Sequence, residues 1–328
     1  MYGLINGAMT EIYEKSLYYL IEMHDDIVGL FADLKESTKF ELFSDKYDKR
    51  FLDIETTEKT LFAIAAGLAK CDLKTYLSIF DVSASMKALE QVRTDICYQN
   101  LNVKIIATNW SLSFGQCETT NRCIEDIAIM RSMSNMKVVV PADSVEAAKA
   151  IIESYDLRGP VYIRIDECLD KKLYKNEEYE FKIGKGIELK EGTDITIIAC
   201  GSSVHQALEA AKILEDMHQL KVRVINMHTI KPIDKDVILN AIRETRRIIT
   251  VEEHNVIGGL GSAVSEVIAE SGKACIFKSL GISDEFFTSG LHEDLMAYYK
   301  INAKGILEEV REILRKNFDD DNDWEDEV

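Results

Sequence analysis

The chain lacks several features that mark common classes of protein. Its seven cysteines form no CxxC pair and their number is odd, so the sequence indicates neither a zinc site nor a disulfide framework. No apolar run approaches the ~18 residues needed to span a bilayer, and no basic region followed by an apolar run and a cleavage site opens the chain. These absences favour a cytoplasmic protein with reduced thiols and no membrane segment.

Positive charge is also scarce. Lys and Arg total 39 against 57 Asp and Glu, which gives a formal net charge of -18. Nucleic-acid binding needs clustered cations that neutralise phosphates, so this composition argues against nucleic acid and against an anionic membrane surface. Hydrophobic residues make up 46% of the 328 residues, which is enough for a large core and for two domains of ordinary size.

Short apolar runs alternate with helical patterns through the first half of the chain. In order, they predict a strand at 103–108, a helix at 123–133, a strand at 136–140, a helix from Asp143 or Ser144 to about Tyr155, and a strand at 161–165. Strand, helix and strand in this rhythm imply a parallel sheet with helices on both faces. The sequence therefore predicts a doubly wound α/β unit.

Beyond residue 168 the alternation of predicted strands and helices stops, and it resumes after residue 192. The stretch to residue 192 crowds charges together with little periodicity, as a linker does. A second α/β unit follows, with strands at 195–199, 221–225 and 247–252 and helices at 204–218, near 234–243 and from about 262. The last residues form a single-sign acidic run, which predicts a solvated tail.

Seven segments of the chain occur in a characteristic order. They are Asp33–Thr38, Thr57–Ala69, Leu101–Ile106, Glu125–Arg131, Val139–Asp143, Val224–Asp234 and Glu252–Ser262. From about residue 10 to about residue 315, their order and spacing resemble the C-terminal half of transketolase, a thiamine diphosphate enzyme. The resemblance implies a pyrimidine-binding domain at 1–170, a linker at 171–192, a transketolase C-terminal domain at 193–316 and an acidic tail at 317–328.

The resemblance also implies a partner chain. The family's metal signature, Gly-Asp-Gly with a downstream Asn, belongs to a preceding domain and does not occur here. A separate N-terminal subunit is therefore expected to hold the cofactor's diphosphate together with Mg2+ or Ca2+, in an α2β2 assembly with active sites between subunits. This chain is expected to bind no metal. Its glycine-rich turn, Gly258–Gly261, is expected to lead a strand into a helix, and His228 and His254 to be hydrogen-bonded structural residues.

Glu58 is the candidate catalytic residue. From the residues alone, Thr56 or Thr57 caps a helix, and a glutamate in its first turn favours the helix dipole. The resemblance places Glu58 at the family's activating glutamate, whose carboxyl hydrogen-bonds the aminopyrimidine ring of the cofactor. Burial against that ring is expected to raise the pKa of Glu58. Lys59 stands where the family has glutamine, and its ammonium would hold the carboxyl ionised if it pointed inward.

Two further positions match the cofactor pocket of the family. Phe80 aligns with an aromatic of the pyrimidine pocket and is equally compatible with plain core. Ser83 stands where the family has a stacking ring, worth roughly 0.5–1.5 kcal/mol beyond its buried area. Either Phe80, Trp110 or a residue of the partner fills that space, or the affinity for cofactor is poor. Glu58, Phe80 and Ser83 are the candidate cofactor-binding residues.

The substrate positions depart further from the family. Ser37 is kept, but Thr10, Asn109 and Glu167 align with an arginine, a histidine and a second arginine that hold a sugar phosphate. A phosphate dianion beside Glu167 would be repelled, so an unphosphorylated or otherwise unusual small-molecule substrate is expected. The candidate substrate-binding residues are Ser37, Asn109, Cys117 and Asn121, the last two at the positions of an aspartate and a histidine.

The function that the resemblance implies is transfer of a two-carbon ketol or related acyl unit by a split transketolase-like enzyme. A 2-oxo acid dehydrogenase β subunit and a deoxyxylulose-phosphate synthase-like subunit are alternatives, because both share the two domains and the glutamate. A non-catalytic scaffold or regulatory subunit is a third. Glu58 counts against it, whereas Ser83, Asn109 and Cys117 count for it.

Overall fold

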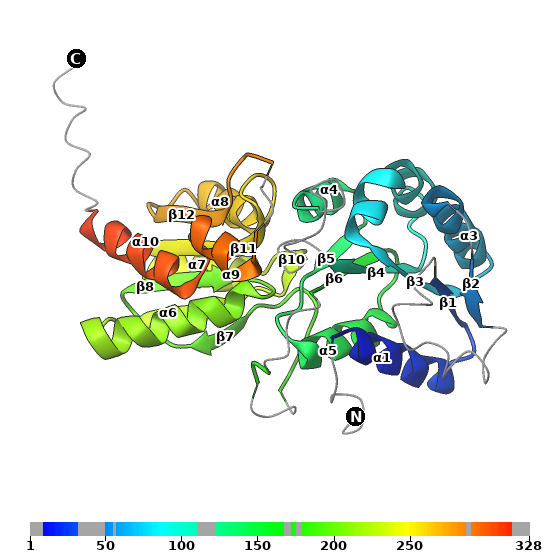
Figure 1. The fold of residues 1–328 in the computed structure, drawn as a ribbon, viewed down its shortest axis with the longest axis horizontal. Coiled ribbons are helices and arrows are strands. Elements are labelled where there is room, and N and C mark those ends of the chain that lie inside the picture. Colours follow the sequence, from blue (N-terminus) through cyan, green and yellow to red (C-terminus); the bar gives the residue numbers. More distant parts are fainter. Residues whose placement is uncertain are drawn as a thin grey trace, which may run out of the picture.

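The computed structural model describes residues 9–31, 50–54, 57–109, 123–166, 172–174, 179–286 and 290–316. Within these ranges the chain forms two α/β units, each a sheet with helices packed against it (Figure 1). The expected α/β fold with two doubly wound, mostly parallel units is confirmed. None of the described helices is long and apolar enough to cross a membrane.

The first sheet has the strand order β10-β5-β6-β4-β3-β1-β2. Its strands are β1 (Ile27–Phe31), β2 (Phe51–Asp53), β3 (Lys74–Phe80), β4 (Val103–Asn109), β5 (Lys137–Val139), β6 (Val161–Asp166) and β10 (Thr229–Lys231). Neighbouring strands are parallel except β10, which pairs antiparallel with β5. Since β10 comes from the second half of the chain, this sheet joins the two halves.

Helices cover both faces of the first sheet (Figure 1). α1 (Met9–Met23) and α5 (Ser144–Ser154) pack together on one face. The other face carries α3 (Glu58–Lys70), two π-helical segments, η1 (Ser83–Lys87) and η2 (Gln91–Cys97), and α4 (Asp126–Ser132). Asp143 caps α5 as predicted, because its carboxylate accepts the Glu146 N–H at 2.8 Å.

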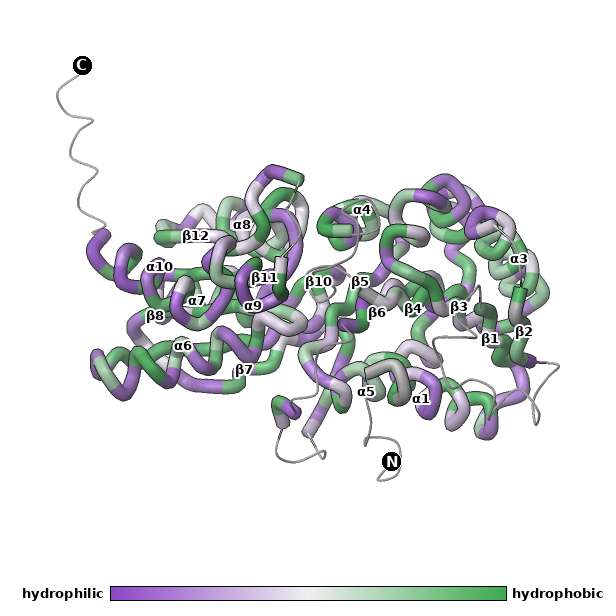
Figure 2. Tube along the Cα trace, viewed as in Figure 1, coloured by the Kyte–Doolittle hydropathy of each residue, from purple (hydrophilic) through white to green (hydrophobic). Residues whose placement is uncertain are grey.

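The second sheet has the strand order β12-β11-β8-β9-β7. Its strands are β7 (Ile187–Lys190), β8 (Ile195–Ala199), β9 (Val222–Asn226), β11 (Arg247–Asn255) and β12 (Ile276–Ile282). Its helices are α6 (Ser203–His218), α7 (Lys235–Glu244), α8 (Leu260–Ser271), α9 (His292–Tyr298) and α10 (Ala303–Arg315). Along α6 and α10, which pack together, hydrophobic and hydrophilic residues alternate as expected for helices with one buried face (Figure 2).

The stretch predicted as a linker contains β7 and is held against both units. β7 pairs antiparallel with β9. Leu173 donates its backbone N–H to Asp143 at 2.7 Å, and the Tyr174 hydroxyl donates to Glu146 at 3.1 Å. The buried Glu146 also accepts the side-chain amide of Asn226 at 2.9 and 3.1 Å. One carboxyl of α5 thus binds the connecting segment and the second sheet together.

Candidate active site

Glu58 lies where a helix begins beside the end of a strand. It is the first residue of α3, which follows β2, and the turn after β3 lies next to it because parallel strands end at the same edge of a sheet. Thr57 occupies the N-cap position with extended backbone, but its side chain makes no capping bond. A carboxylate in the first turn is favoured by the helix dipole.

Two side chains of η1 bind the Glu58 carboxylate. Ser83 Oγ donates to Glu58 Oε1 at 3.2 Å, and Lys87 Nζ donates to the same oxygen at 2.8 Å. Ser83 and Lys87 are four residues apart and reach Glu58 from the same side of η1. The Lys87 ammonium, with a smaller contribution from the Ser83 hydroxyl, holds the pKa of Glu58 below its ordinary value.

This direction is opposite to the expected rise of the Glu58 pKa. In the chain by itself, burial does raise the pKa of Glu58, but the hydrogen bond from Lys87 outweighs it. The cation is also not the one that the sequence suggested, since Lys59 is exposed to solvent. The sequence did not identify Lys87 as a partner of Glu58. The four-residue spacing between Ser83 and Lys87 could have indicated it, because side chains at that spacing point the same way from a helical segment.

The other two cofactor candidates lie at the same edge. Phe80 is the last residue of β3 and is partly buried, opposite Thr108 of β4. Ser83 is buried, and in place of the family's stacking ring it offers a hydroxyl to Glu58. The fold therefore brings Glu58 and Ser83 into contact, and Phe80 ends the strand that leads to Ser83.

The substrate candidates lie mostly outside the described residues. This holds for Ser37, Cys117, Asn121 and Glu167, and also for Trp110. Of Thr10 and Asn109 only the backbone is described, in α1 and at the end of β4. Asn109 pairs with Asp166 of β6, so its backbone is at the carboxyl edge of the first sheet, as are Phe80 and the start of η1.

The glycine-rich turn has the structural role that was predicted. Glu252 accepts the backbone N–H groups of Leu260 and Gly261, each at 2.7 Å, and so caps the first turn of α8. A Cβ atom at Gly259 would lie 2.0 Å from Glu252 Oε2, and Gly258 has a positive φ of 81°. The Glu252 carboxylate thus accepts two backbone donors of this turn, and the Ser262 hydroxyl accepts a third, the Gly258 N–H, at 2.8 Å.

The two histidines are buried and hydrogen-bonded, as predicted. His254 Nε2 accepts the Ala128 N–H at 3.3 Å across the two units, and His228 Nδ1 lies 2.9 Å from Thr229 Oγ1. Burial lowers the pKa of His254 to about 4 and that of His228 to about 3. Both rings are therefore neutral at pH 7. The His254 ring bonds across the two units, whereas the His228 ring packs against Phe181.

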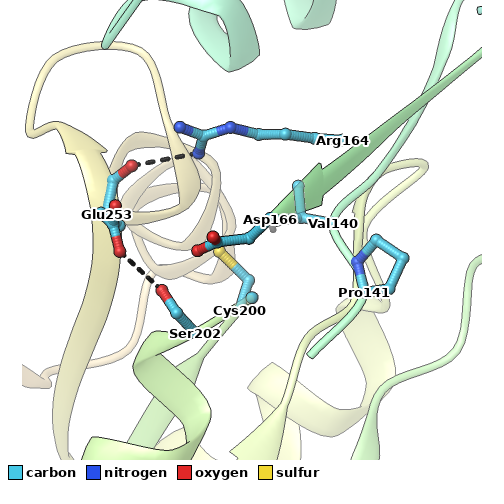
Figure 3. A pocket seen from close by; sticks show the side chains of 8 residues that line it. Val140, Pro141, Arg164, Asp166, Cys200, Ser202 and Glu253 are labelled. Carbon is cyan, nitrogen blue, oxygen red and sulfur yellow. Dashed lines mark hydrogen bonds between the residues drawn. The ribbon is translucent and has the colours of Figure 1, made fainter. Parts of the chain in front are cut away.

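A small polar cavity lies where the two units meet (Figure 3). It is lined by Val140, Pro141, Arg164, Asp166, Cys200, Gly201, Ser202 and Glu253. Arg164 and Ser202 reach Glu253 from opposite sides, bonding its backbone oxygen at 3.0 Å and its carboxylate at 2.7 Å. Its volume of about 10 Å³ has room for about one water, so it is too small for a sugar.

Comparison with known proteins assigns this chain to a family. The family described as transketolase, pyrimidine binding domain, matches residues 6–170, and transketolase, C-terminal domain, matches residues 184–306. A transketolase C-terminal section assigned in Methanocaldococcus jannaschii is 37% identical, over 96% of this chain and 98% of that protein. A subunit of the apulose-4-phosphate transketolase of Phocaeicola vulgatus is 32% identical, over 94% of this chain and 98% of that protein.

A solved structure agrees with these matches. A split-gene transketolase described as an inactive β4 tetramer superposes with a TM-score of 0.85 at 36% identity, over 94% of this chain and 98% of that one. The relatives are themselves named as sections or subunits, and they match this chain along nearly their whole length. The chain therefore belongs to the transketolase family and contains its pyrimidine-binding and C-terminal domains.

Proposed function

We propose that this chain is the C-terminal subunit of a two-component, thiamine diphosphate-dependent transferase of the transketolase type. The observation that carries the proposal is the setting of Glu58, a carboxylate at the start of α3 held by Ser83 and Lys87 at the carboxyl edge of the first sheet. Relatives of matching length that are named as transketolase subunits support it.

The residues at this edge fit the aminopyrimidine end of the cofactor. Both bonds from η1 use Glu58 Oε1, so neither of them occupies Oε2. With its pKa lowered by Lys87, Glu58 is ionised near neutral pH, and it would accept a hydrogen bond from a protonated ring nitrogen of the aminopyrimidine. Phe80 ends β3, three residues before Ser83. When bound, thiamine diphosphate supplies a carbon nucleophile for bond cleavage and formation next to a carbonyl group.

The rest of the cofactor site is assigned to a second chain. An N-terminal subunit would bind the diphosphate with Mg2+ or Ca2+, and active sites would form between subunits in an α2β2 assembly. The solved relative described as an inactive β4 tetramer is in line with a subunit that needs such a partner. We retain 1–170 and 193–316 as the two domains and 171–192 as their connection.

The substrate is proposed to be an unphosphorylated, or otherwise unusual, ketol donor or acceptor. This rests on Thr10, Asn109 and Glu167, which offer no cation where the family holds a phosphate. A ketose, its phosphate ester and a 2-oxo acid should be compared as donors for the two-chain enzyme. The free ketose should give the highest kcat/KM. A strong preference for the ester would overturn the substrate proposal, and turnover of the 2-oxo acid alone would replace ketol transfer with an alternative reaction.

The two-component proposal is tested by mixing purified chains with thiamine diphosphate and Mg2+. Cofactor binding measured by calorimetry should occur in the mixture and in neither chain alone. Glu58→Gln should lower turnover by about 10²–10⁴-fold, while Glu209→Gln, a change at an exposed residue of α6, should leave it unchanged. Full turnover in the Glu58→Gln enzyme would show that the carboxyl has no role in the reaction.

A further inference from the structure

The η1 segment, which holds Glu58, begins at a buried carboxyl. Asp81 precedes it in the chain, and Asp81 Oδ1 accepts the Val82 N–H at 2.6 Å. The backbone oxygen of Asp81 accepts the Ser85 hydroxyl at 2.7 Å. Asp81 thus fixes the first turn of the segment whose next residues reach Glu58, so a shift of Asp81 is transmitted to the candidate active site.

Asp81 lies in the field of a second buried carboxyl, Asp126 of α4. Burial raises the pKa of Asp81 well above its ordinary value, and the charge of Asp126 raises it further. In the part of the chain that the structure describes, Asp81 Oδ2 and Asp126 Oδ1 have no hydrogen-bond partner. Tyr162 donates its hydroxyl to Asp126 Oδ2 at 2.7 Å, but a hydroxyl adds no positive charge. A buried carboxylate such as Asp126 needs a cation nearby.

Arg164 of β6 supplies that cation and also contacts the second unit. Its Nε lies 3.3 Å from Asp126 Oδ2, and its charge lowers the pKa of Asp81 against the effect of burial. Its Nη1 donates to the backbone oxygen of Glu253 in β11 at 3.0 Å (Figure 3). The side chain is almost fully buried. One guanidinium is therefore held between Asp126 of α4, a helix that packs against η1, and the backbone of the second unit.

We propose that Arg164 is a positioning residue that couples docking of the C-terminal domain to the placement of η1, and through Ser83 and Lys87 to Glu58. The relevance of this coupling to turnover rests on the proposed function. The coupling itself is a property of this chain. The side chains that bind Glu58 come from the first domain, yet the backbone of the second domain holds the cation that pairs with Asp126, and α4, which carries Asp126, packs against η1.

The first test needs no cofactor. The titration of Glu58 is followed by NMR in the chain labelled with ¹³C at glutamate carboxyls, with Glu58→Gln assigning the signal. In Arg164→Gln, which keeps a donor for Glu253 but removes the charge, displacement of η1 should weaken the Lys87 contact and shift the Glu58 pKa upward. Arg164→Lys, which keeps the charge, should titrate like the unaltered chain.

Arg223→Gln is the matched control, because Arg223 is a nearly buried arginine of β9 that pairs with Glu188 and Glu244, whereas Arg164 pairs with Asp126. It should lower the melting temperature without moving the Glu58 titration. An unchanged Glu58 pKa in a folded Arg164→Gln chain would overturn the proposal. If the Arg164→Gln chain does not fold, the Arg164→Lys chain decides. A shifted Glu58 pKa in a folded Arg164→Lys chain of normal stability would show that the positive charge at this position does not hold η1 in place.

The second test uses the two-chain enzyme. Arg164→Gln should bind thiamine diphosphate about tenfold more weakly, Arg164→Lys should restore most of the affinity, and Arg223→Gln should bind normally. If the unaltered mixture binds no cofactor, the proposed function fails while the NMR result still decides the coupling. If Arg164→Gln and Arg223→Gln lower stability equally and neither changes cofactor affinity, Arg164 serves structure alone.

Discussion

Replacing Glu146 by glutamine should make the stability of this chain less sensitive to pH. Glu146 is fully buried and accepts hydrogen bonds from Ala142, Asn226 and Tyr174. Burial raises its pKa from the ordinary value of 4.5 to about 7. The native chain therefore keeps a proton in this window that the unfolded chain has released, so this carboxyl costs stability as the pH rises from about 4.5 to 7.

The size of the effect follows from the shift. At 1.36 kcal/mol per pKa unit, the rise corresponds to about 3 kcal/mol. Urea denaturation followed by circular dichroism should give the free energy of unfolding at pH 5, 6, 7 and 8. Because glutamine mimics the protonated carboxyl and does not titrate, Glu146→Gln should gain about 2.5 kcal/mol of that amount relative to the unaltered chain between pH 5 and pH 8.

The control for this experiment is Glu209→Gln, a change at an exposed residue, which should not alter the pH dependence. Other buried groups, such as Glu252, are common to all the chains and cancel in the difference. A stability difference between Glu146→Gln and the unaltered chain that stays constant within about 1 kcal/mol from pH 5 to pH 8 would refute the assignment of a raised pKa to Glu146.

Two further predictions concern Glu58 and the glycine-rich turn. Lys87→Met should raise the pKa of Glu58 toward its ordinary value, since the main cause that lowers it is removed; an unchanged carboxyl titration by NMR would contradict the Lys87 contact. Gly259→Ala should destabilise the chain by about 1–3 kcal/mol because a Cβ would collide with the carboxylate of Glu252. Gly67→Ala, in the interior of α3 with open space around it, should stabilise it by about 0.5–1 kcal/mol; equal melting temperatures for the two variants would contradict this packing.

Much of the fold could be predicted because its strands are buried on both faces. β4, β6, β8 and β9 are rich in buried apolar residues, as parallel strands between two layers of helices must be. Asp143 could be predicted as a helix cap from its residue type and position. The short strands β7 and β10 were not predicted, because three or four residues carry too little periodicity. β10 also crosses to the sheet of the other unit.

The candidate site could be predicted only in part. Glu58 alone is an ordinary first-turn glutamate, and the resemblance to transketolase singled it out. The contact with Lys87 joins residues 29 positions apart, and it depends on how α3 and η1 pack. Arg164 gave no signal in the sequence, since an arginine in an apolar strand reveals neither Asp126 nor the backbone of the second unit that it contacts. Distant side-chain pairs of this kind require the three-dimensional arrangement.

The central claim is that Glu58 activates a cofactor whose diphosphate is bound by another chain. The most direct measurement is the rate at which the thiazolium C2 proton of thiamine diphosphate exchanges with deuterium oxide, followed by NMR after acid quench of the two-chain complex. Exchange should be fast in the complex, and Glu58→Gln should slow it by about 10²–10⁴-fold while the cofactor stays bound. An exchange rate that is the same with Glu58 and with glutamine, in complexes that bind cofactor equally, would contradict the account.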